Sequence, residues 1–427
     1  MSPGRGAYAV AVLEPPPSRV LVLGLARSGR AATVALRRSG IEVVAHDRDP
    51  GLDAGDVDAD VSLGDWDDAL LEGVELVVKS PGVPGESRPV MAARRAGLPV
   101  ISELELGARL LPNPLLCVTG TNGKTTTTAL LGAVLEAAGR PVEVAGNIGR
   151  PLTAVVGVGD EVAWVVCEVS SFQLEDVVTL RPRVAVLVNL EPDHLDRHGS
   201  LESYAAAKLR LFENQGPDDV AVVPSGFDRV PGAARRIEFS ADDPLPAEPR
   251  IPGAHNRENA AAATAAARAI GVPDVAIAAA LRSFPGVAHR IEPVAERGGV
   301  RYVNDSKATN VAAALRALQA FPGVAKHVIL GGRGKAEPYA PLAAAFEAGD
   351  RAYVVGEAAA ELGAALRAAG VPVTDAGDLE TALRRASAAA RPGDVVLLSP
   401  ACASFDQYRD FEHRGEEFRR LVAKLGG

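Results

Sequence analysis

The sequence lacks any apolar run of the roughly 18 residues that a membrane-spanning helix needs. The first residues, up to Ser18, carry Pro15-Pro16-Pro17 and lack the apolar segment of a signal peptide, so we expect a loose tail there. Cysteine is scarce, since Cys117, Cys167 and Cys402 are far apart and show no metal-binding spacing. These features predict a cytoplasmic protein whose thiols are buried and reduced.

Basic and aromatic residues are too few for a nucleic-acid-binding surface. The 427 residues carry a net charge of −9, and aromatic residues make up 4% of them. This balance argues against nucleic acid as the main partner but allows anionic small molecules, which a few local lysines and arginines can hold. The hydrophobic share of 47% is enough for large cores, and the length predicts two or three domains.

The sequence does contain a glycine-rich turn between an apolar strand, Leu115 to Val118, and a predicted helix, Thr127 to Ala138. The turn is Gly120-Thr121-Asn122-Gly123-Lys124-Thr125-Thr126, which has the layout of a phosphate-binding loop. Glycines let backbone N–H groups face an anion, Lys124 supplies a positive charge, and Thr125 offers a hydroxyl to Mg²⁺. A valine replaces the first glycine of the usual pattern, so a helix start without a ligand remains the alternative.

Ionisable residues follow two further predicted strands of this middle region. Glu168 ends the apolar strand that begins at Ala163, which is the position of a Mg²⁺ ligand beside a phosphate loop, or else a helix-start carboxylate. The loop after the strand Val184 to Asn189 carries Asp193, His194, Asp196 and His198. We single out Asp193 and His194 as functional and interpret the other two as structural.

Three more polar positions in the middle region have simple alternatives. The turn Gly146-Asn147-Ile148-Gly149 presents an amide side chain. Within the predicted helix Leu201 to Phe212, the residue pattern alone places Lys208 on the solvent-exposed surface. Asn256 is a predicted N-cap, and Asn259 follows on the same helix face, which either holds a nucleotide or caps the helix.

The first 50 residues contain a β-α-β unit of the Rossmann type. A strand at Arg19 to Leu23 leads into the turn Gly24 to Gly29, and a second strand ends at Asp47. Ala26 stands where the middle glycine of a dinucleotide fingerprint belongs. The unit therefore suits the phosphate or ribose of a nucleotide as well as a dinucleotide, or no ligand at all.

Alternation of strands and helices predicts an α/β protein of three domains. They are a Rossmann-like N-terminal domain, a central P-loop ATPase-like parallel sheet and a C-terminal Rossmann-like α/β domain. Proline-rich segments near 111–114 and 284–286 give the boundaries 19–112, 113–286 and 287–427. In the last domain, polar loops follow strands at 304–310, 331–335 and 399–406.

Together these motifs resemble the Mur ligases, which are ATP-dependent amide-bond-forming enzymes of peptidoglycan synthesis. The resemblance runs from about Val20 to the C-terminus, and the motifs in family order are Thr119 to Thr126, Gly146 to Gly149, Asp193-His194, His255-Asn256-x-x-Asn259, His289-Arg290 and Asn304 to Asn310. Two further segments, Glu168 to Leu174 and Ser399 to Asp406, are similar to those of members that add D-glutamate to UDP-N-acetylmuramoyl-L-alanine.

The resemblance implies a reaction and its partners. ATP would phosphorylate a substrate carboxylate to an acyl phosphate, and the amine of D-glutamate would then displace the phosphate. The first domain would bind the UDP substrate, the central domain ATP and the last domain the amino acid. The expected protein is a cytoplasmic monomer that acts on small molecules, with neither nucleic acid nor a membrane as partner.

The resemblance also assigns roles to residues. The catalytic residues would be Lys124, His194 and Lys208. Two Mg²⁺ ions would be held, one by Thr125 and Glu168 and one by His194 and a carbamylated Lys208, which overturns the surface interpretation of Lys208. The ATP site would comprise Gly120, Thr121, Asn122, Gly123, Lys124, Thr125, Thr126, Asn147, Asn256, Asn259, Arg290 and Asp305. The substrates would contact Arg27, Ser28, Gly29, Asp47, Arg48, Ser80, Gln173, Lys307, Thr309, Lys335, Ser404, Phe405 and Phe411.

Three other functions remain as alternatives. Another ligase of the superfamily, such as a folylpolyglutamate synthase or a different Mur ligase, is the nearest, but a folylpolyglutamate synthase would start at the phosphate loop. A nucleotide-binding switch would need neither the Asp193-His194 cluster nor a third domain. A dinucleotide oxidoreductase would leave the phosphate loop unexplained.

Overall fold

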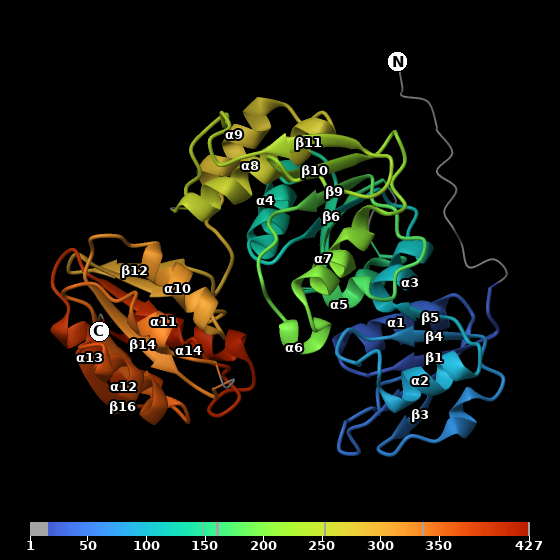
Figure 1. Cartoon of the computed structure of the whole chain (residues 1–427), viewed down its shortest axis with the longest axis horizontal. Coiled ribbons are helices and arrows are strands. Elements are labelled where there is room, and N and C mark those ends of the chain that lie inside the picture. The colour runs from blue at the N-terminus through green and yellow to red at the C-terminus, as the bar shows by residue number, and fades with distance from the viewer. Residues whose placement is uncertain (1–15, 148, 159–161, 252, 335–336, 426–427) are drawn as a thin grey trace. The chain divides into compact units, whose positions relative to one another are not determined.

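The computed structural model describes residues 16–147, 149–158, 162–251, 253–334 and 337–425, and every structural statement below concerns these residues. The chain divides into two compact units, Met1–Phe284 and Pro285–Gly427, which are described separately. The first unit holds two parallel sheets and the second unit holds one mixed sheet (Figure 1). The α/β class and its three sheet-based domains are therefore confirmed.

The first sheet has five parallel strands in the order β3-β2-β1-β4-β5. Because the order reverses between β1 and β4, the loops that follow these two strands flank the crevice where such sheets bind ligands. The elements of this domain are β1 (Arg19–Leu23), α1 (Arg27–Arg38), β2 (Glu42–Asp47), β3 (Asp60–Leu63), η1 (Asp68–Leu71), β4 (Leu76–Lys79), α2 (Arg88–Arg95), β5 (Val100–Ser102) and α3 (Glu103–Leu110).

The second sheet has six parallel strands in the order β11-β10-β9-β6-β8-β7. Strand β6 is central and buried at all five positions, which explains its continuous apolar sequence. The elements are β6 (Leu115–Thr119), α4 (Lys124–Ala137), β7 (Val142–Gly146), η2 (Leu152–Val155), β8 (Trp164–Glu168), α5 (Ser171–Leu174), β9 (Val184–Leu187), α6 (Leu195–His198), α7 (Leu201–Leu209), η3 (Arg210–Phe212), β10 (Val220–Pro224), β11 (Arg235–Phe239), α8 (Ala254–Ala269) and α9 (Asp274–Ser283).

The third sheet, in the second unit, has six strands in the order β12-β13-β17-β14-β15-β16, and β12 alone among them runs antiparallel to its neighbour. The elements are β12 (Glu292–Arg297), β13 (Val300–Asn304), α10 (Val311–Gln319), β14 (Lys326–Gly331), α11 (Ala340–Ala343), β15 (Arg351–Val355), α12 (Ala359–Ala368), β16 (Val373–Gly377), α13 (Leu379–Ala389), β17 (Val395–Leu398) and α14 (Phe411–Lys424). The expected domain limits at 112 and 286 stay predictions.

The three thiols are buried and free, as the sequence predicts. Cys117 on β6 and Cys167 on β8 are register partners in the second sheet.

Among the described residues, no helix is both long and apolar enough to cross a membrane.

Candidate active site

The phosphate loop leaves the central strand β6 and enters α4 at Lys124. Gly120 and Gly123 have φ values of +149° and +80°, which L-residues with side chains rarely adopt. A Cβ on Gly123 would overlap Oδ1 of Asn259, so this glycine also allows α8 to approach the loop. Lys124 folds back over the loop, and its Nζ donates to the carbonyl oxygens of Gly120 and Thr121, both at 2.8 Å.

The tip of the phosphate loop is tied to the segment that follows β9. The backbone N–H of Thr121 donates to the carbonyl oxygen of Asn189 (3.1 Å), and that of Asn122 donates to the Asn189 side-chain oxygen (2.9 Å). The Thr121 hydroxyl donates to the Glu191 carbonyl oxygen (3.0 Å) and accepts from the Tyr204 hydroxyl (3.2 Å). These bonds fix the loop against the chain that carries Asp193 and His194.

Lys208 lies inside the protein, so the surface interpretation of this lysine is wrong. Its residue is 2% exposed, and its Nζ donates to the carbonyl oxygen of Gly120 at 2.8 Å and lies 4.4 Å from the centroid of the Tyr204 ring. Burial, and secondarily the ammonium of Lys124, lower the pKa of Lys208 to about 6. The amine is therefore largely neutral at pH 7, which is the form that reacts with CO₂.

Glu168 ends β8 one strand away from the phosphate loop. Its Oε1 accepts from Asn147 Nδ2 at 3.2 Å, and the Asn147 backbone N–H donates to the Glu168 carbonyl oxygen at 2.8 Å. Within the part of the chain that the structure describes, Oε2 is buried and has no hydrogen-bond partner. A buried carboxylate oxygen without a partner is costly, and a bound cation would remove that cost.

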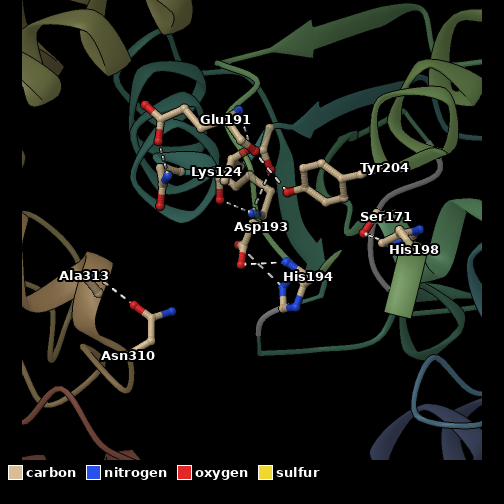
Figure 2. Close-up of polar contacts among 12 residues, drawn as sticks. Lys124, Ser171, Glu191, Asp193, His194, His198, Tyr204, Asn310 and Ala313 are labelled. Atoms are coloured by element: carbon tan, nitrogen blue, oxygen red, sulfur yellow. Dashed lines mark hydrogen bonds and ion pairs between the residues drawn. The ribbon is translucent and has the colours of Figure 1, made fainter. Parts of the chain in front are cut away.

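His194 stands at the start of α6 in a strained backbone conformation, with φ at +50°. Its Nε2 lies 3.6 Å from Asp193 Oδ2, and Figure 2 shows these two side chains turned toward each other. The His194 ring packs edge-on against Phe172 at 4.9 Å between centroids. Beyond it, His198 Nε2 lies 3.0 Å from the Ser171 hydroxyl. The structural interpretation of His198 stays a prediction, and the side chain of Asp196 lies outside what the structure describes.

Asn256 is not the N-cap of its helix, contrary to the sequence-based expectation. Gly253, with φ at +105°, caps α8, and Asn256 is the third helical residue because the glycine ends the preceding loop early. Asn256 and Asn259 are both buried, and Nδ2 of Asn259 donates to Oδ1 of Asn256 at 3.3 Å. The pair faces the phosphate loop, because Asn259 lies against Gly123.

In the first domain, the residues expected to bind a nucleotide surround the ends of β1 and β4. The Ser80 hydroxyl donates to the Gly24 carbonyl oxygen at 2.9 Å, which joins the two strand ends. Arg27 is exposed and begins α1, whose N-terminus has no side-chain cap because the preceding residue is alanine. A helix start of this kind suits an anion. Half-buried Ser28 and buried Gly29 follow Arg27 in the same helix turn.

Asp47, at the end of β2, accepts backbone hydrogen bonds with both of its carboxylate oxygens. Oδ2 accepts from the Leu25 N–H at 2.7 Å, and Oδ1 accepts from the Asp49 N–H at 3.0 Å. Arg48 beside it is exposed. Gln173, expected at the substrate, completes a capping box with Ser170 at the start of α5, and its side-chain oxygen accepts from the Ser170 N–H. Its contact with substrate stays a prediction.

The second unit gathers its expected site residues at the ends of β13 and β17. Asp305 accepts from the Ser399 hydroxyl (2.8 Å) and from the Ile291 N–H (3.1 Å), and burial raises the pKa of Asp305 to about 7. Lys307 Nζ lies 5.8 Å from the centroid of the Phe411 ring. The other expected residues of this unit that the structure describes are Arg290, Thr309, buried Ser404 and exposed Phe405. Lys335 lies outside the described residues.

Several residues at the site were missed by the sequence reasoning. Asn189, Glu191 and Tyr204 hold the phosphate loop. Within the second unit, Asn310, the last residue of the predicted 304–310 loop, caps α10 by accepting from the Ala313 N–H at 2.8 Å (Figure 2). Tyr204 is one helical turn before Lys208, and an aromatic residue at that spacing was the available signal.

The donors fit divalent cations in part. Among the described side chains, no group of three or more His, Cys, Asp or Glu residues converges to hold a metal ion. Thr125, 6% exposed in the first turn of α4, and the unpartnered Oε2 of Glu168 are oxygen donors of the kind that Mg²⁺ prefers. The remaining ligands would have to come from phosphate oxygens, from water and from a modified Lys208.

Comparison with known proteins identifies the domains. Three family models match the chain: "Mur ligase MurD-like, N-terminal domain" at residues 18–102, "Mur ligase middle domain" at 118–240 and "Mur ligase, glutamate ligase domain" at 289–402. The chain is 44% identical to the UDP-N-acetylmuramoylalanine--D-glutamate ligase of Acidobacterium capsulatum, over 95% of this chain and 96% of the relative. It is 45% identical to the protein of that name from Anaeromyxobacter dehalogenans, over 95% and 98%.

Solved structures show the same fold at lower identity. The UDP-N-acetylmuramate-alanine ligase of Thermotoga maritima matches with a TM-score of 0.62 and 18% identity, over 95% of this chain and 99% of that one. A folylpolyglutamate synthase/dihydrofolate synthase of Yersinia pestis, crystallised with AMPPNP and Mn ion, matches with a TM-score of 0.55 and 21% identity, over 76% of this chain and 93% of that one. On the strength of its curated relatives and its three matching domain models, the chain belongs to the Mur ligase family.

Proposed function

We propose that this protein joins D-glutamate to UDP-N-acetylmuramoyl-L-alanine in peptidoglycan precursor synthesis, converting ATP to ADP and phosphate. The observation that carries the proposal is the 44% identity, spread over 95% of the chain, to a relative named for this reaction. The match includes the family's glutamate ligase domain at residues 289–402. A folylpolyglutamate synthase is less well supported, because its solved structure matches over 76% of the chain.

ATP would bind with its β- and γ-phosphates in the phosphate loop. The backbone N–H groups at the start of α4 and the ammonium of Lys124 would face the phosphate oxygens. Lys124 Nζ now bonds to two loop carbonyl oxygens, so it would exchange these for phosphate oxygens when ATP binds. Asn147, which bonds to Glu168, and the pair Asn256 and Asn259, which lies against Gly123, would contact the nucleotide.

Mg²⁺ would neutralise charge on the phosphates and on the acyl phosphate. Thr125 and Glu168 would hold one ion, and the unpartnered Glu168 Oε2 supports that assignment. His194 and a carbamylated Lys208 would hold a second ion. The lowered pKa of Lys208 supports carbamylation, since the nitrogen of a neutral amine bonds to the carbon of CO₂ and releases a proton to solvent, which leaves an anionic carbamate oxygen donor.

The chemistry consists of two displacements. A carboxylate oxygen of the L-alanyl group attacks the γ-phosphorus of ATP and ADP leaves, which gives an acyl phosphate. The neutral amine nitrogen of D-glutamate then attacks the acyl carbon, and inorganic phosphate leaves with the electron pair of the broken C–O bond and takes up the proton that the nitrogen releases. Because several anionic groups meet here, positive charge from Lys124 contributes more than a protein nucleophile would.

Substrate contacts outside the central domain remain part of the proposal. Arg27, Ser28, Gly29 and Ser80 would meet the diphosphate, and Asp47 and Arg48 the uridine. The amino-acid side and the rest of the nucleotide site would use Arg290, Asp305, Lys307, Thr309, Lys335, Ser404, Phe405 and Phe411, together with Gln173 on the substrate. We also propose that the protein is a cytoplasmic monomer with domains at 19–112, 113–286 and 287–427.

Phosphate release with paired substrates tests the function. We expect release that requires ATP, Mg²⁺, UDP-N-acetylmuramoyl-L-alanine and D-glutamate together. Replacing D-glutamate by L-glutamate or by a diamino acid should reduce release to background. Equal activity with those amino acids would contradict the D-glutamate assignment but leave an ATP-dependent ligase.

A further inference from the structure

A cluster of five charged side chains joins the first and second domains within the first unit. Lys79, at the end of β4, is fully buried, and its Nζ lies 2.9 Å from Asp176 Oδ2 and 3.5 Å from Glu175 Oε2. Arg94 on α2 donates to Asp176 Oδ1 at 2.8 Å. Arg197 on α6 donates to Glu175 Oε2, also at 2.8 Å. The proposed reaction gives none of these five residues a role.

Arg197 differs from the rest of the cluster because it contacts the Phe172 ring in addition to an acidic residue after α5 and the loop that follows β4. Besides Glu175, it donates through Nη1 to the carbonyl oxygen of Pro81, at 3.3 Å, in the loop that follows β4. Its guanidinium carbon also lies 4.0 Å from the centroid of the Phe172 ring. A planar guanidinium can stack on a ring and donate at its edges simultaneously, which a lysine ammonium cannot do.

Phe172 lies between Arg197 and the ring of His194, the proposed metal ligand. The Phe172 ring contacts the Arg197 guanidinium. It also packs edge-on against the His194 ring, with 4.9 Å between ring centroids, and stacks with the His198 ring at 5.5 Å between centroids. Arg197 is three residues after His194, and its backbone N–H donates to the His194 carbonyl oxygen at 3.1 Å. The orientation of the His194 ring therefore depends on Phe172, and the position of Phe172 depends on Arg197.

The loop on the other side of Arg197 is also functional in the proposed enzyme. Pro81 follows Ser80, whose hydroxyl bonds to Gly24 at the end of β1, where the substrate diphosphate would bind. Arg197 thus makes direct contact with the substrate loop and, through Phe172, with the ring of His194.

We propose that Arg197 is a positioning residue, which orients His194 through Phe172 for metal binding and holds it in register with the substrate loop at Pro81. This inference rests on the proposed function, because it takes His194 as a metal ligand. Groups that orient a metal ligand from behind typically affect metal affinity by about 10- to 100-fold.

The test measures metal binding directly, with Mn²⁺ as the probe and a non-hydrolysable ATP analogue present. Free Mn²⁺ is counted by electron paramagnetic resonance for the full-length wild type, Arg197→Met, Arg197→Lys and Arg94→Met. Arg94 is the matched control because it belongs to the same cluster, while its hydrogen bonds among the described residues go to Gly85 and Asp176 and not to α6. Thermal unfolding of each variant is recorded in parallel.

We expect Arg197→Met to weaken Mn²⁺ binding about 10-fold or more at one class of site, Arg197→Lys to do so partly, and Arg94→Met to stay within about twofold of wild type. In turnover assays, Arg197→Met should raise both the Mg²⁺ requirement and the KM for the UDP substrate, with a smaller change in the KM for ATP. Phe172→Leu should reproduce the Mn²⁺ defect with Arg197 still present.

Three outcomes would overturn the proposal. Arg197→Met could lower the melting temperature and leave Mn²⁺ binding unchanged, which would mean that the cluster only stabilises the contact between the first and second domains. Arg94→Met could weaken Mn²⁺ binding as much as Arg197→Met does. The wild type could bind no Mn²⁺ with the analogue, which would remove the ligand role of His194. A wild type that binds Mn²⁺ but does not use D-glutamate would contradict the proposed function and leave Arg197 testable in the same way.

Discussion

The side-chain nitrogen of Lys208 donates a 2.8 Å hydrogen bond to the carbonyl oxygen of Gly120, the first glycine of the phosphate loop. Lys124 donates to that same oxygen at the same distance. Two lysine amines therefore share one acceptor, and the structure would bring two positive charges together if both were protonated. This arrangement explains why the pKa of Lys208 falls to about 6, because burial and the nearby Lys124 ammonium both disfavour its charged form.

Replacing Lys208 by methionine should stabilise the unmodified protein while abolishing ligation. The folded lysine has a pKa of about 6 and the unfolded one the ordinary value of 10.5, so between these pH values the unfolded chain binds more protons. The free energy of unfolding of the wild type therefore rises with pH across this window, by at most about 1.4 kcal/mol per pH unit. In CO₂-free buffer at pH 7, urea denaturation should show Lys208→Met to be more stable by roughly 1–4 kcal/mol.

The advantage of Lys208→Met should shrink as the pH approaches 10, because the unfolded lysine then loses its proton as well. Lys424→Met provides the control for the loss of one lysine, since Lys424 is exposed on α14. A stability difference that is independent of pH would mean that Lys208 is not held neutral in the folded protein.

Short carboxylic acids should partly restore the activity of Lys208→Ala. Truncation leaves a small space beside the Gly120 carbonyl, and a carboxylate there would replace the oxygen donor that a carbamylated lysine supplies. Phosphate release in formate or acetate should exceed release in chloride at equal ionic strength. Glu168→Ala should not be rescued to the same degree, because the position that Glu168 vacates differs from that of Lys208. Full activity of Lys208→Ala without added acid would remove the ligand role.

Lys124→Ala should abolish ATP-dependent ligation and leave the fold intact. Loss of one preorganised charge at a phosphoryl-transfer site costs roughly 10²- to 10³-fold in rate. The same change should raise the pKa of Lys208 toward its ordinary value, because the Lys124 ammonium is one cause of its depression. Phosphate release and circular dichroism check the first part, with Lys124→Arg as the charge-preserving control. Near-normal turnover in a folded Lys124→Ala variant would refute the phosphate-loop assignment.

The phosphate loop and the ionisable strand ends could be predicted from the sequence because their signals are local. An apolar run predicts a buried strand, and in a parallel sheet the loops that follow strands gather along one edge. Thus Glu168 and the loop that carries His194 were expected near Lys124, and both follow strands adjacent to β6. The three-domain fold followed from the same alternation of strands and helices.

The burial of Lys208 could not be predicted in that way. Its helix, α7, has alanines around the lysine, so apart from Tyr204 one turn earlier nothing in the helix sequence indicates which side packs inward. The contacts of Lys79 and Arg197 depend on how the first domain packs on α5 and α6, and no local pattern records that packing. The N-cap of α8 was predicted wrongly because the prediction followed the N-cap preference of asparagine at position 256. The glycine three residues earlier, whose positive φ ends the loop, is the N-cap.

Gly123 offers a geometric test of the nucleotide site. Its φ of +80° lies in the left-handed region, and a Cβ built there would overlap Oδ1 of Asn259. Gly139, just after α4, also has a positive φ of +67°, but an added Cβ there would meet nothing within 4 Å. A substitution at either glycine therefore strains the backbone, but only a substitution at Gly123 also causes a clash with a neighbouring side chain.

Gly123→Ala should lose more than Gly139→Ala in both stability and nucleotide binding. The shared strain of a positive φ costs about 1 kcal/mol, and displacing the buried pair Asn256 and Asn259 should add about 1–3 kcal/mol for Gly123→Ala. Urea denaturation measures the difference, and fluorescence titration with an ATP analogue should show binding weakened about 10-fold or more for Gly123→Ala alone. If both variants bind the analogue equally well, Asn259 does not set the geometry of the loop, because its displacement would then have no effect on the phosphate site.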